Sequence, residues 1–258
     1  MSSRAGPLVV TFEGEIGAGK STLIDHVRDA FLARGLNAVV VPEPVDEWRR
    51  VGILQEFYAD KKPDCRGMVA YDFQTYTFVT RVMEIQRAAA AHPDADVFLL
   101  ERCPLTDRHV FMELQREMVG AVRMAMYNKW WGLWTQLVPF TPQKVVYLKP
   151  TLGNCQSRVS ARAREGEVAA AGERSADESD DKASARGGVS AAYQARLRRA
   201  HEAFLQGRHA AEFPGMPPRP FSDADTLVVE GALADDDFSA PGPAADRVAA
   251  CIVEHILA

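Results

Sequence analysis

The sequence is short of three features that would place the protein in other classes. It carries no excess of basic residues, because 30 Lys and Arg residues stand against 35 Asp and Glu residues and the formal net charge is −5. Without a general positive field, we expect no nucleic acid as a partner. No apolar run approaches the length of about 20 residues that a membrane-spanning helix needs, so we expect no membrane partner either.

Cysteine is the third scarce feature. The chain has four cysteines, which are far apart and form no C-x-x-C pair: Cys65, Cys103, Cys155 and Cys251. This spacing predicts reduced thiols rather than a disulfide framework or a zinc site. Residues 1–7 are too few for a signal or transit peptide before the first β-like run, so we expect a cytoplasmic protein.

The feature that is present and most informative is a phosphate-loop (P-loop) motif, in which two glycines five positions apart precede Lys and Ser. The motif and the next residue are Gly14, Glu15, Ile16, Gly17, Ala18, Gly19, Lys20, Ser21 and Thr22. It stands between an apolar β-like run at 8–12 and a helical pattern at 23–31, the context that a P-loop needs and a chance Gly-rich turn lacks. Backbone N–H groups and the helix N-terminus then surround phosphate oxygens. We expect ATP and Mg²⁺ as cofactors, with Lys20 on the β- and γ-phosphates and Ser21 on Mg²⁺.

Strand-like and helix-like segments alternate along the chain. Apolar runs typical of buried strands occur at 8–12, 38–41, 97–100, 145–148 and 227–229, and helical patterns occur at 68–91, 109–137, 152–165, 191–206 and 244–257. Residues 60–67 read as a loop. The alternation predicts one α/β domain over residues 1–258, with a five-stranded parallel sheet flanked by helices. Ligands of such sheets bind at the carboxyl ends of the strands, where the P-loop, Glu43 and Glu101-Arg102 fall.

Two other stretches carry structural expectations. Residues 168–190 are rich in Ala, Gly, Ser and acidic residues without apolar periodicity, which predicts a solvated, disordered insertion. The aromatic cluster of Trp130, Trp131 and Trp134 is more typical of a core or a subunit interface than of a ligand cage.

Four segments beyond the P-loop narrow the function. They are Pro42-Glu43-Pro44-Val45 with Trp48, Phe73-Gln74-Thr75-Tyr76, Glu101-Arg102 with Thr106-Asp107-Arg108, and the arginine-rich stretch 158–167. In this order and spacing they resemble the deoxynucleoside kinases, the family of deoxycytidine, deoxyguanosine and insect multisubstrate kinases. The resemblance runs from the P-loop to the helix around Tyr193. It implies a P-loop kinase fold with an arginine-rich lid, and a homodimer formed through helix surfaces between Met112 and Trp134.

The reaction implied by the resemblance is phosphorylation of a deoxynucleoside at its 5′-hydroxyl by ATP, a step of nucleotide salvage. Glu43 stands where the family places the carboxylate that accepts the hydroxyl proton. Glu101 is the second candidate for this base, and the family also implies that it holds Mg²⁺ with Ser21. Arg102 is expected to contact the 5′-oxygen and the incoming phosphate, and a salt bridge from Arg102 to Glu43 is an alternative that is compatible with this role.

The resemblance also implies roles for the residues of the lid. Arg158, Arg162 and Arg164 are expected to neutralise charge on the transferring phosphoryl group, and Arg162 or a neighbour to stack on the adenine. Glu167 is expected to reach the sugar 3′-hydroxyl together with Tyr58.

The base pocket is assigned in the same way. Gln74 offers a donor and an acceptor to a base edge. Arg81 and Asp107 occupy positions at which charged residues favour deoxycytidine and purine deoxynucleosides over thymidine; the alternative is a structural ion pair. Trp48, Phe73 and Phe111 are expected to wall the sugar and base, although bare aromatic residues are more often core.

The sequence departs from the family pattern at Glu15, where Asn is common, and at Cys103 and Pro104. A carboxylate beside phosphates needs a partner or an outward orientation.

Two other functions compete with the kinase interpretation. A thymidylate-type monophosphate kinase would need basic residues for the acceptor's own phosphate, and Glu43 would be out of place against that anion. A non-catalytic kinase-like subunit should have lost Lys20, Glu43, Glu101 or a lid arginine, and none is missing.

Overall fold

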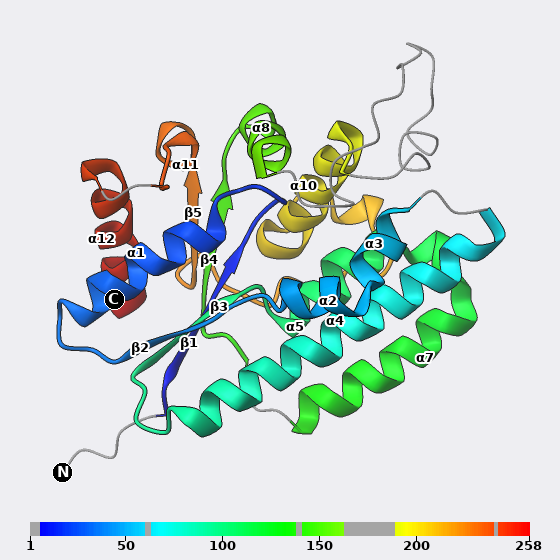
Figure 1. Cartoon of the computed structure of the whole chain (residues 1–258), viewed down its shortest axis with the longest axis horizontal. Helices are drawn as coiled ribbons and strands as arrows, with labels where there is room; N and C mark the ends of the chain where they lie inside the picture. The colour runs from blue at the N-terminus through cyan, green and yellow to red at the C-terminus, as the bar shows by residue number, and fades with distance from the viewer. Residues whose placement is uncertain (1–5, 60–62, 138–140, 163–188, 240–241) are drawn as a thin grey trace.

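The fold is a parallel β-sheet with helices on both faces (Figure 1). In the computed structural model the described residues are 6–59, 63–137, 141–162, 189–239 and 242–258. The five strands are β1 (Leu8–Glu13), β2 (Ala38–Val41), β3 (Val97–Glu101), β4 (Lys144–Lys149) and β5 (Thr226–Glu230). They pair in the order β2-β3-β1-β4-β5, and every pair is parallel. The predicted five-stranded parallel sheet is therefore confirmed.

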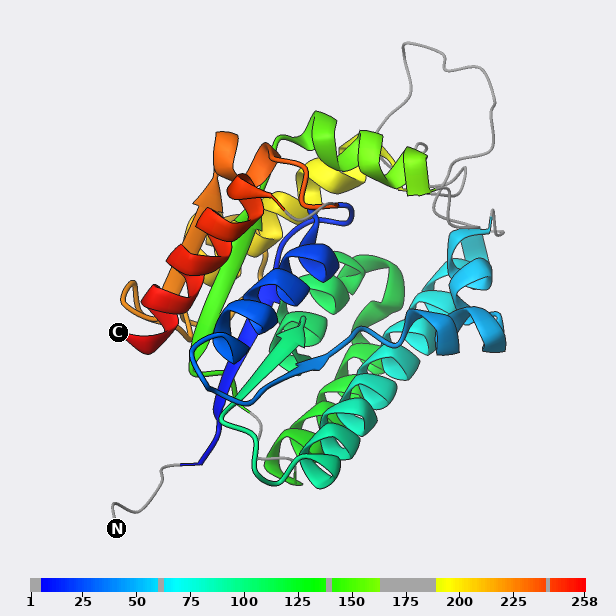
Figure 2. The same ribbon diagram turned by 60° about the vertical axis from the view of Figure 1, so that its left-hand side comes forward.

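Alternate residues of the central strands serve two different cores, as the two-residue period of a strand requires. Val10 and Phe12 of β1 pack with helices α1 (Lys20–Leu32) and α12 (Pro243–Leu257) on one face. Val9 packs on the other face with α4 (Pro63–Ala91) and α7 (Arg116–Leu137). The two views of the ribbon show these two helix layers on opposite sides of the sheet (Figures 1 and 2). Because both faces are covered, the strands read as continuous apolar runs.

The register of β1 aligns the functional ends of three strands. Phe12 pairs with Glu101 of β3, and Glu13 pairs with Tyr147 of β4. The carboxyl end of β3 is therefore level with the start of the P-loop. A third core forms where Tyr147 packs with Leu197 of helix α10 (Ala191–Gln206).

The shorter helical elements gather around this edge of the sheet or connect the larger ones. They are α2 (Val45–Val51), α3 (Ile53–Tyr58), α5 (Pro104–Thr106), a π-helical turn (Asp107–Phe111), α6 (Met112–Leu114), α8 (Leu152–Arg162), a 3-10 turn (Ala210–Glu212) and α11 (Ala232–Asp235).

The structure corrects the predicted start of one helix, α4, and does not describe most of the predicted insertion at 168–190. Residues 63–67, predicted as part of a loop, begin α4; a proline at the first turn of a helix loses no hydrogen bond. Residues 163–188 are not described, so the predicted insertion at 168–190 lies almost wholly outside the described residues, as do the last three residues of the helix predicted at 152–165. Ser190 caps α10 by accepting a hydrogen bond from the Tyr193 backbone N–H.

All four cysteines are free in the structure. In the described part of the chain, every helix is too short or too polar to cross a bilayer.

Candidate active site

A cavity opens at the carboxyl ends of β1, β2 and β3, where the P-loop begins. Its volume of about 280 Å³ is close to the lower end of small-molecule sites, roughly 300 Å³. The predicted site residues that line it are Ile16, Gly17, Lys20, Ser21, Glu43, Trp48, Tyr58, Phe73, Gln74, Arg81, Glu101, Arg102, Asp107, Phe111 and Arg162. One cavity thus collects residues that follow β1, β2 and β3 with residues of α4 and of the end of α8.

The P-loop has the backbone that phosphate binding requires. Gly17 and Gly19 have φ angles of 81° and 95°, a region that disfavours side chains. A Cβ on Gly17 would also lie 2.5 Å from the carbonyl oxygen of Cys155, so only glycine fits there. Lys20 is buried, and its Nζ donates to the Glu15 carbonyl oxygen at 3.2 Å. Burial, assisted by the nearby charge of Arg102, lowers the pKa of Lys20 to about 8.

Glu15, the departure from the family pattern, faces inward and has a partner. Its carboxylate is fully buried and accepts hydrogen bonds from Nε of Arg198 at 2.7 Å and from the Tyr147 hydroxyl at 3.2 Å. Arg198 lies on α10, so a helix late in the chain supplies the charge that an acidic P-loop residue needs.

Ser21 and Glu101 meet at the mouth of the loop. The Ser21 hydroxyl donates to the Glu101 carboxylate at 3.0 Å, which places two hard oxygen ligands side by side. Among the described residues no group of three or more His, Cys, Asp and Glu side chains forms a metal cluster. Mg²⁺ fits such a sparse site, because it usually takes one or two carboxylates and completes its shell with phosphates and water.

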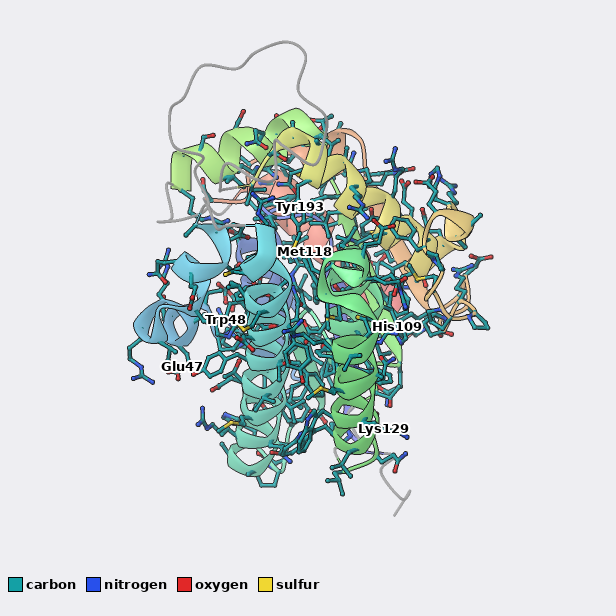
Figure 3. All side chains as sticks on the ribbon, turned by 90° about the vertical axis from the view of Figure 1, so that its right-hand side faces the viewer. Glu47, Trp48, His109, Met118, Lys129 and Tyr193 are labelled. Atoms are coloured by element: carbon teal, nitrogen blue, oxygen red, sulfur yellow. The ribbon has the colours of Figure 1, made fainter. Side chains whose placement is uncertain are left out.

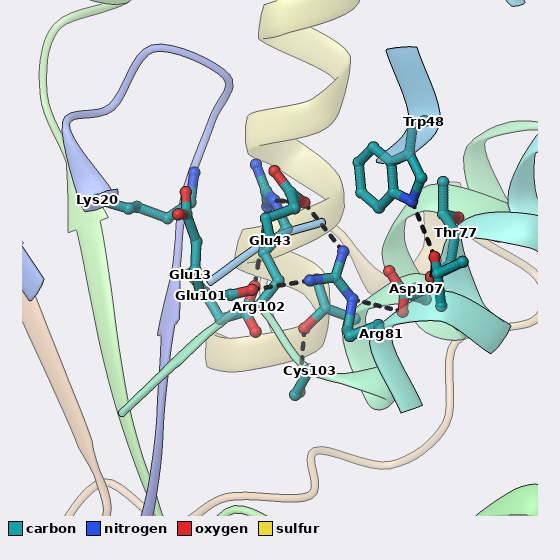
Figure 4. Close-up of polar contacts among 12 residues, drawn as sticks. Glu13, Lys20, Glu43, Trp48, Thr77, Arg81, Glu101, Arg102, Cys103 and Asp107 are labelled. Atoms are coloured by element: carbon teal, nitrogen blue, oxygen red, sulfur yellow. Dashed lines mark hydrogen bonds and ion pairs between the residues drawn. The ribbon is translucent and has the colours of Figure 1, made fainter. Parts of the chain in front are cut away.

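Glu43 is the centre of a buried charge cluster (Figure 4). Its Oε1 lies 2.9 Å from Nη2 of Arg81 and 3.3 Å from Nε of Arg102. Burial by itself would raise the pKa of Glu43, but the two guanidinium groups outweigh it and hold the pKa at about 2. Glu43 is therefore ionised at neutral pH.

Arg81 joins this cluster to the far wall of the cavity. Its Nε donates to Asp107 at 2.8 Å and its Nη1 to the Glu101 carbonyl oxygen at 2.7 Å (Figure 4). Burial lowers the pKa of Arg81, but Asp107 and Glu43 more than offset that effect. The predicted Arg81–Asp107 pair is thus an ion pair that also lines the cavity, which is compatible with both of its interpretations.

Arg102 has a strained backbone and contacts two residues that the sequence pattern did not single out, Glu13 and His201. Its φ is 65°, uncommon for a residue with a side chain. Its guanidinium lies 4.6 Å from the centre of the Phe111 ring and 3.8 Å from the carboxylate of Glu13. His201 of α10 is 3.4 Å from the Arg102 Nη1. Glu13 could have been found as the residue that ends β1 beside the motif, whereas nothing in the sequence around His201 indicates this contact.

Aromatic side chains form the remaining wall. The Trp48 Nε1 donates to the Thr80 hydroxyl at 2.8 Å, which fixes the indole, and Phe73 packs edge-on against it. Phe57, which the sequence analysis did not single out, stacks on Phe73 with ring centres 4.3 Å apart. Gln74 is buried beside this wall. Contact of these residues with a sugar and base stays a prediction.

The predicted lid arginines differ in their surroundings: Arg158 is bound to main-chain oxygens, whereas Arg162 lines the cavity. Arg158 is bound to main-chain oxygens, those of Ala18 in the P-loop at 3.0 Å and of Asp235 and Asp236 at 3.2 and 2.7 Å. Arg162 lines the cavity from the end of α8. Arg164 and Glu167 lie outside the described residues. Of the P-loop residues, Gly14, Glu15, Ala18, Gly19 and Thr22 are not among those that line the cavity.

Known proteins similar to this chain include enzymes named for nucleoside phosphorylation. A family model described as "Deoxynucleoside kinase" matches residues 10–172. The chain is 29% identical over 160 residues to the probable deoxycytidine kinase of Fowlpox virus, which covers 61% of this chain and 63% of that protein. It is 26% identical over 186 residues to deoxycytidine kinase 2 of Gallus gallus (61% and 66% covered) and 33% identical over 123 residues to the thymidine kinase of Ictalurid herpesvirus 1 (43% and 48% covered). Each match spans less than two thirds of the relative's own length.

Proposed function

The chain belongs to the deoxynucleoside kinase family, and on this premise we propose that it transfers the γ-phosphoryl group of ATP to the 5′-hydroxyl of a deoxynucleoside. The observation that carries the proposal is the ionised Glu43, which lines the same cavity as Lys20 of the P-loop and the aromatic wall. The acceptor hydroxyl would be bound by Glu43 and the donor triphosphate by the P-loop. We further propose that the reaction serves nucleotide salvage.

Glu43 orients the acceptor hydroxyl and takes its proton. A carboxylate with a pKa of about 2 is a weak base. Phosphoryl transfer through a loose transition state makes little demand on base strength, because the hydroxyl loses its proton late. A weak base is therefore sufficient, and Glu43 both positions the nucleophile and accepts its proton. Glu101 remains the second candidate for this role.

Cationic side chains neutralise the phosphates. Lys20 binds the β- and γ-phosphates, and Arg102 and Arg162 contact the phosphoryl group in transfer. Mg²⁺, when bound with the triphosphate, supplies further positive charge against its oxygens, and Ser21 and Glu101 are the residues that would hold it. Arg158 contributes to the P-loop by binding the carbonyl oxygen of Ala18.

We propose deoxycytidine and purine deoxynucleosides as the preferred acceptors. Arg81 and Asp107 are charged and both line the cavity, so the wall they form offers hydrogen bonds rather than apolar space for the 5-methyl group of thymine. Gln74 is proposed to bind the base edge.

We also propose that two copies of the chain pair through α7. Exposed apolar side chains recur along this helix, including Met118, Val122, Met126, Trp130 and Leu133. Figure 3 shows α7 beside α4, with Met118 close to the start of α7 and Lys129 in its second half. A patch of this kind on a water-exposed helix indicates a protein interface.

The test is a phosphorylation assay of the purified protein with ATP–Mg²⁺ against the four deoxynucleosides and thymidylate. Turnover of deoxycytidine or a purine deoxynucleoside, with little of thymidine, is the expected result. Turnover of thymidine alone would keep the reaction and overturn the acceptor preference. Turnover of thymidylate alone would overturn the proposed reaction in favour of a monophosphate kinase. Lys20→Ala, which removes the P-loop ammonium group, is the matched inactive control.

A further inference from the structure

Helix α10 hydrogen-bonds to the first half of the P-loop through two side chains that are one helical turn apart. Gln194 donates to the carbonyl oxygen of Ile16 at 2.6 Å, and Arg198 donates to the carboxylate of Glu15 at 2.7 Å. Arg198 also donates to the carbonyl oxygen of Pro150, beyond the end of β4. Two consecutive loop residues are thus tied to a helix that begins more than 170 residues later in the sequence.

Glu15 puts a negative charge inside a loop whose task is to bind anions. Its side chain is fully buried, so water does not screen the charge. Its Oε2 has no hydrogen-bond partner among the described residues, and its Oε1 is shared between Arg198 and the Tyr147 hydroxyl. Within the described part of the chain, Arg198 is the cation that forms an ion pair with this carboxylate.

We infer that Arg198 is a positioning residue for the phosphate donor: by neutralising Glu15 it lets an acidic P-loop accept a nucleotide. The inference rests on the proposed donor site at this loop. The loop amides and Lys20 attract phosphate, and an uncompensated carboxylate among them would repel it. Arg198 is not among the residues that line the cavity, and it acts through its ion pair with Glu15.

A charge effect and a scaffolding effect of the Glu15–Arg198 pair change the affinity for ADP–Mg²⁺ in different directions. If charge balance matters, Arg198→Gln leaves Glu15 unpaired and weakens ADP–Mg²⁺ binding, by about tenfold or more for one uncompensated buried charge near the phosphates. Glu15→Gln leaves the Arg198 charge in place, so ADP binding is unchanged or tighter. If the pair is only a scaffold, both single substitutions weaken binding alike.

The measurement is the dissociation constant for ADP–Mg²⁺ by isothermal titration calorimetry, for the wild-type chain, both single variants and the double variant Glu15→Gln/Arg198→Gln. We expect the double variant to bind ADP within about threefold of wild type, because no net charge is left unpaired. The matched control is Arg199→Gln, which removes the same charge from the next position of α10. Arg199 pairs with Glu212 and is half exposed, and its loss should leave ADP binding unchanged.

The outcomes are decisive for each proposal. Wild-type affinity in Arg198→Gln, or weakened binding in Glu15→Gln, would overturn the inference while leaving the donor site in place. If the wild-type chain itself fails to bind ADP, the proposed donor site falls and the inference falls with it. If Arg198→Gln does not fold, as judged by its thermal transition, the sign of the Glu15→Gln effect decides alone.

Discussion

Arg81 donates a hydrogen bond of 2.9 Å to Glu43, although the two residues are 38 positions apart and come from different elements. The residue predicted to select the base is therefore ion-paired with the residue predicted to bind the reacting hydroxyl. The pKa of Glu43 depends on this pair, because Arg81 provides the largest opposing charge. If both residues have the proposed roles, acceptor selection and acceptor activation are coupled, and substitutions at Arg81 should affect both.

Replacement of the proposed base is the first prediction. Glu43→Gln keeps the shape of the side chain and removes its charge, so kcat should fall by about 10²- to 10⁴-fold, the usual contribution of a positioned acid–base group. The dissociation constant for ADP–Mg²⁺ should change little. Steady-state kinetics and calorimetry measure the two quantities. Near-normal turnover would transfer the base role to Glu101, and Glu101→Gln is the companion variant.

The second prediction concerns acceptor choice. Arg81→Met combined with Asp107→Ala removes both charges and opens apolar space in the cavity wall. We expect the ratio of kcat/KM for thymidine to that for deoxycytidine to rise by about tenfold or more, since a misfitted polar contact costs on the order of 1–3 kcal/mol. An unchanged ratio would assign the pair a structural role only.

The same pair yields a stability control. Arg81→Met alone leaves Asp107 buried without its cation, which should lower the free energy of unfolding by about 3–5 kcal/mol. The double variant should recover part of that loss, because no unpaired charge remains at position 107. Urea denaturation of both variants checks this expectation, and equal losses in the two would contradict it.

The third prediction is a pH dependence of donor binding. Burial lowers the pKa of Lys20 to about 8, so this side chain loses its proton as the pH rises through about 8. The protonated form binds phosphate, and the affinity for ADP should therefore fall above pH 8, by up to about tenfold per pH unit. Lys20→Arg stays charged throughout, so its affinity should show no such fall. Equal wild-type affinity at pH 7 and pH 9.5 would refute the assignment.

The fourth prediction concerns assembly. Val122 is 76% exposed in the apolar patch of α7, and Val122→Glu places a charge in the proposed interface. Light scattering coupled to size-exclusion chromatography should find twice the chain mass for the wild type and the mass of one chain for the variant. Leu32→Glu, an exposed apolar position at the end of α1, is the control that should remain paired. A wild-type protein with the mass of one chain would overturn the proposal that two copies pair through α7.

The sequence alone determined the five strands, the long helices and the chemical inventory of the site. Apolar runs marked all five strands, and the P-loop pattern marked the start of α1, because strand periodicity and glycine geometry are local properties. The rule that ligands bind at the carboxyl ends of parallel strands then places the P-loop, Glu43 and Glu101 together. The start of α4 was misplaced because residues 63–67 carry little apolar periodicity.

The tertiary structure decided which of these charges neutralise one another. Glu15 and Arg198 are 183 positions apart, and no local pattern connects them. The contact depends on how α10 packs against β4 and the P-loop, as do the contact of His201 with Arg102 and the binding of Arg158 to main-chain oxygens. Side-chain pairing over such separations is set by the packing of whole elements, so the sequence can name the charged residues and only the fold can pair them.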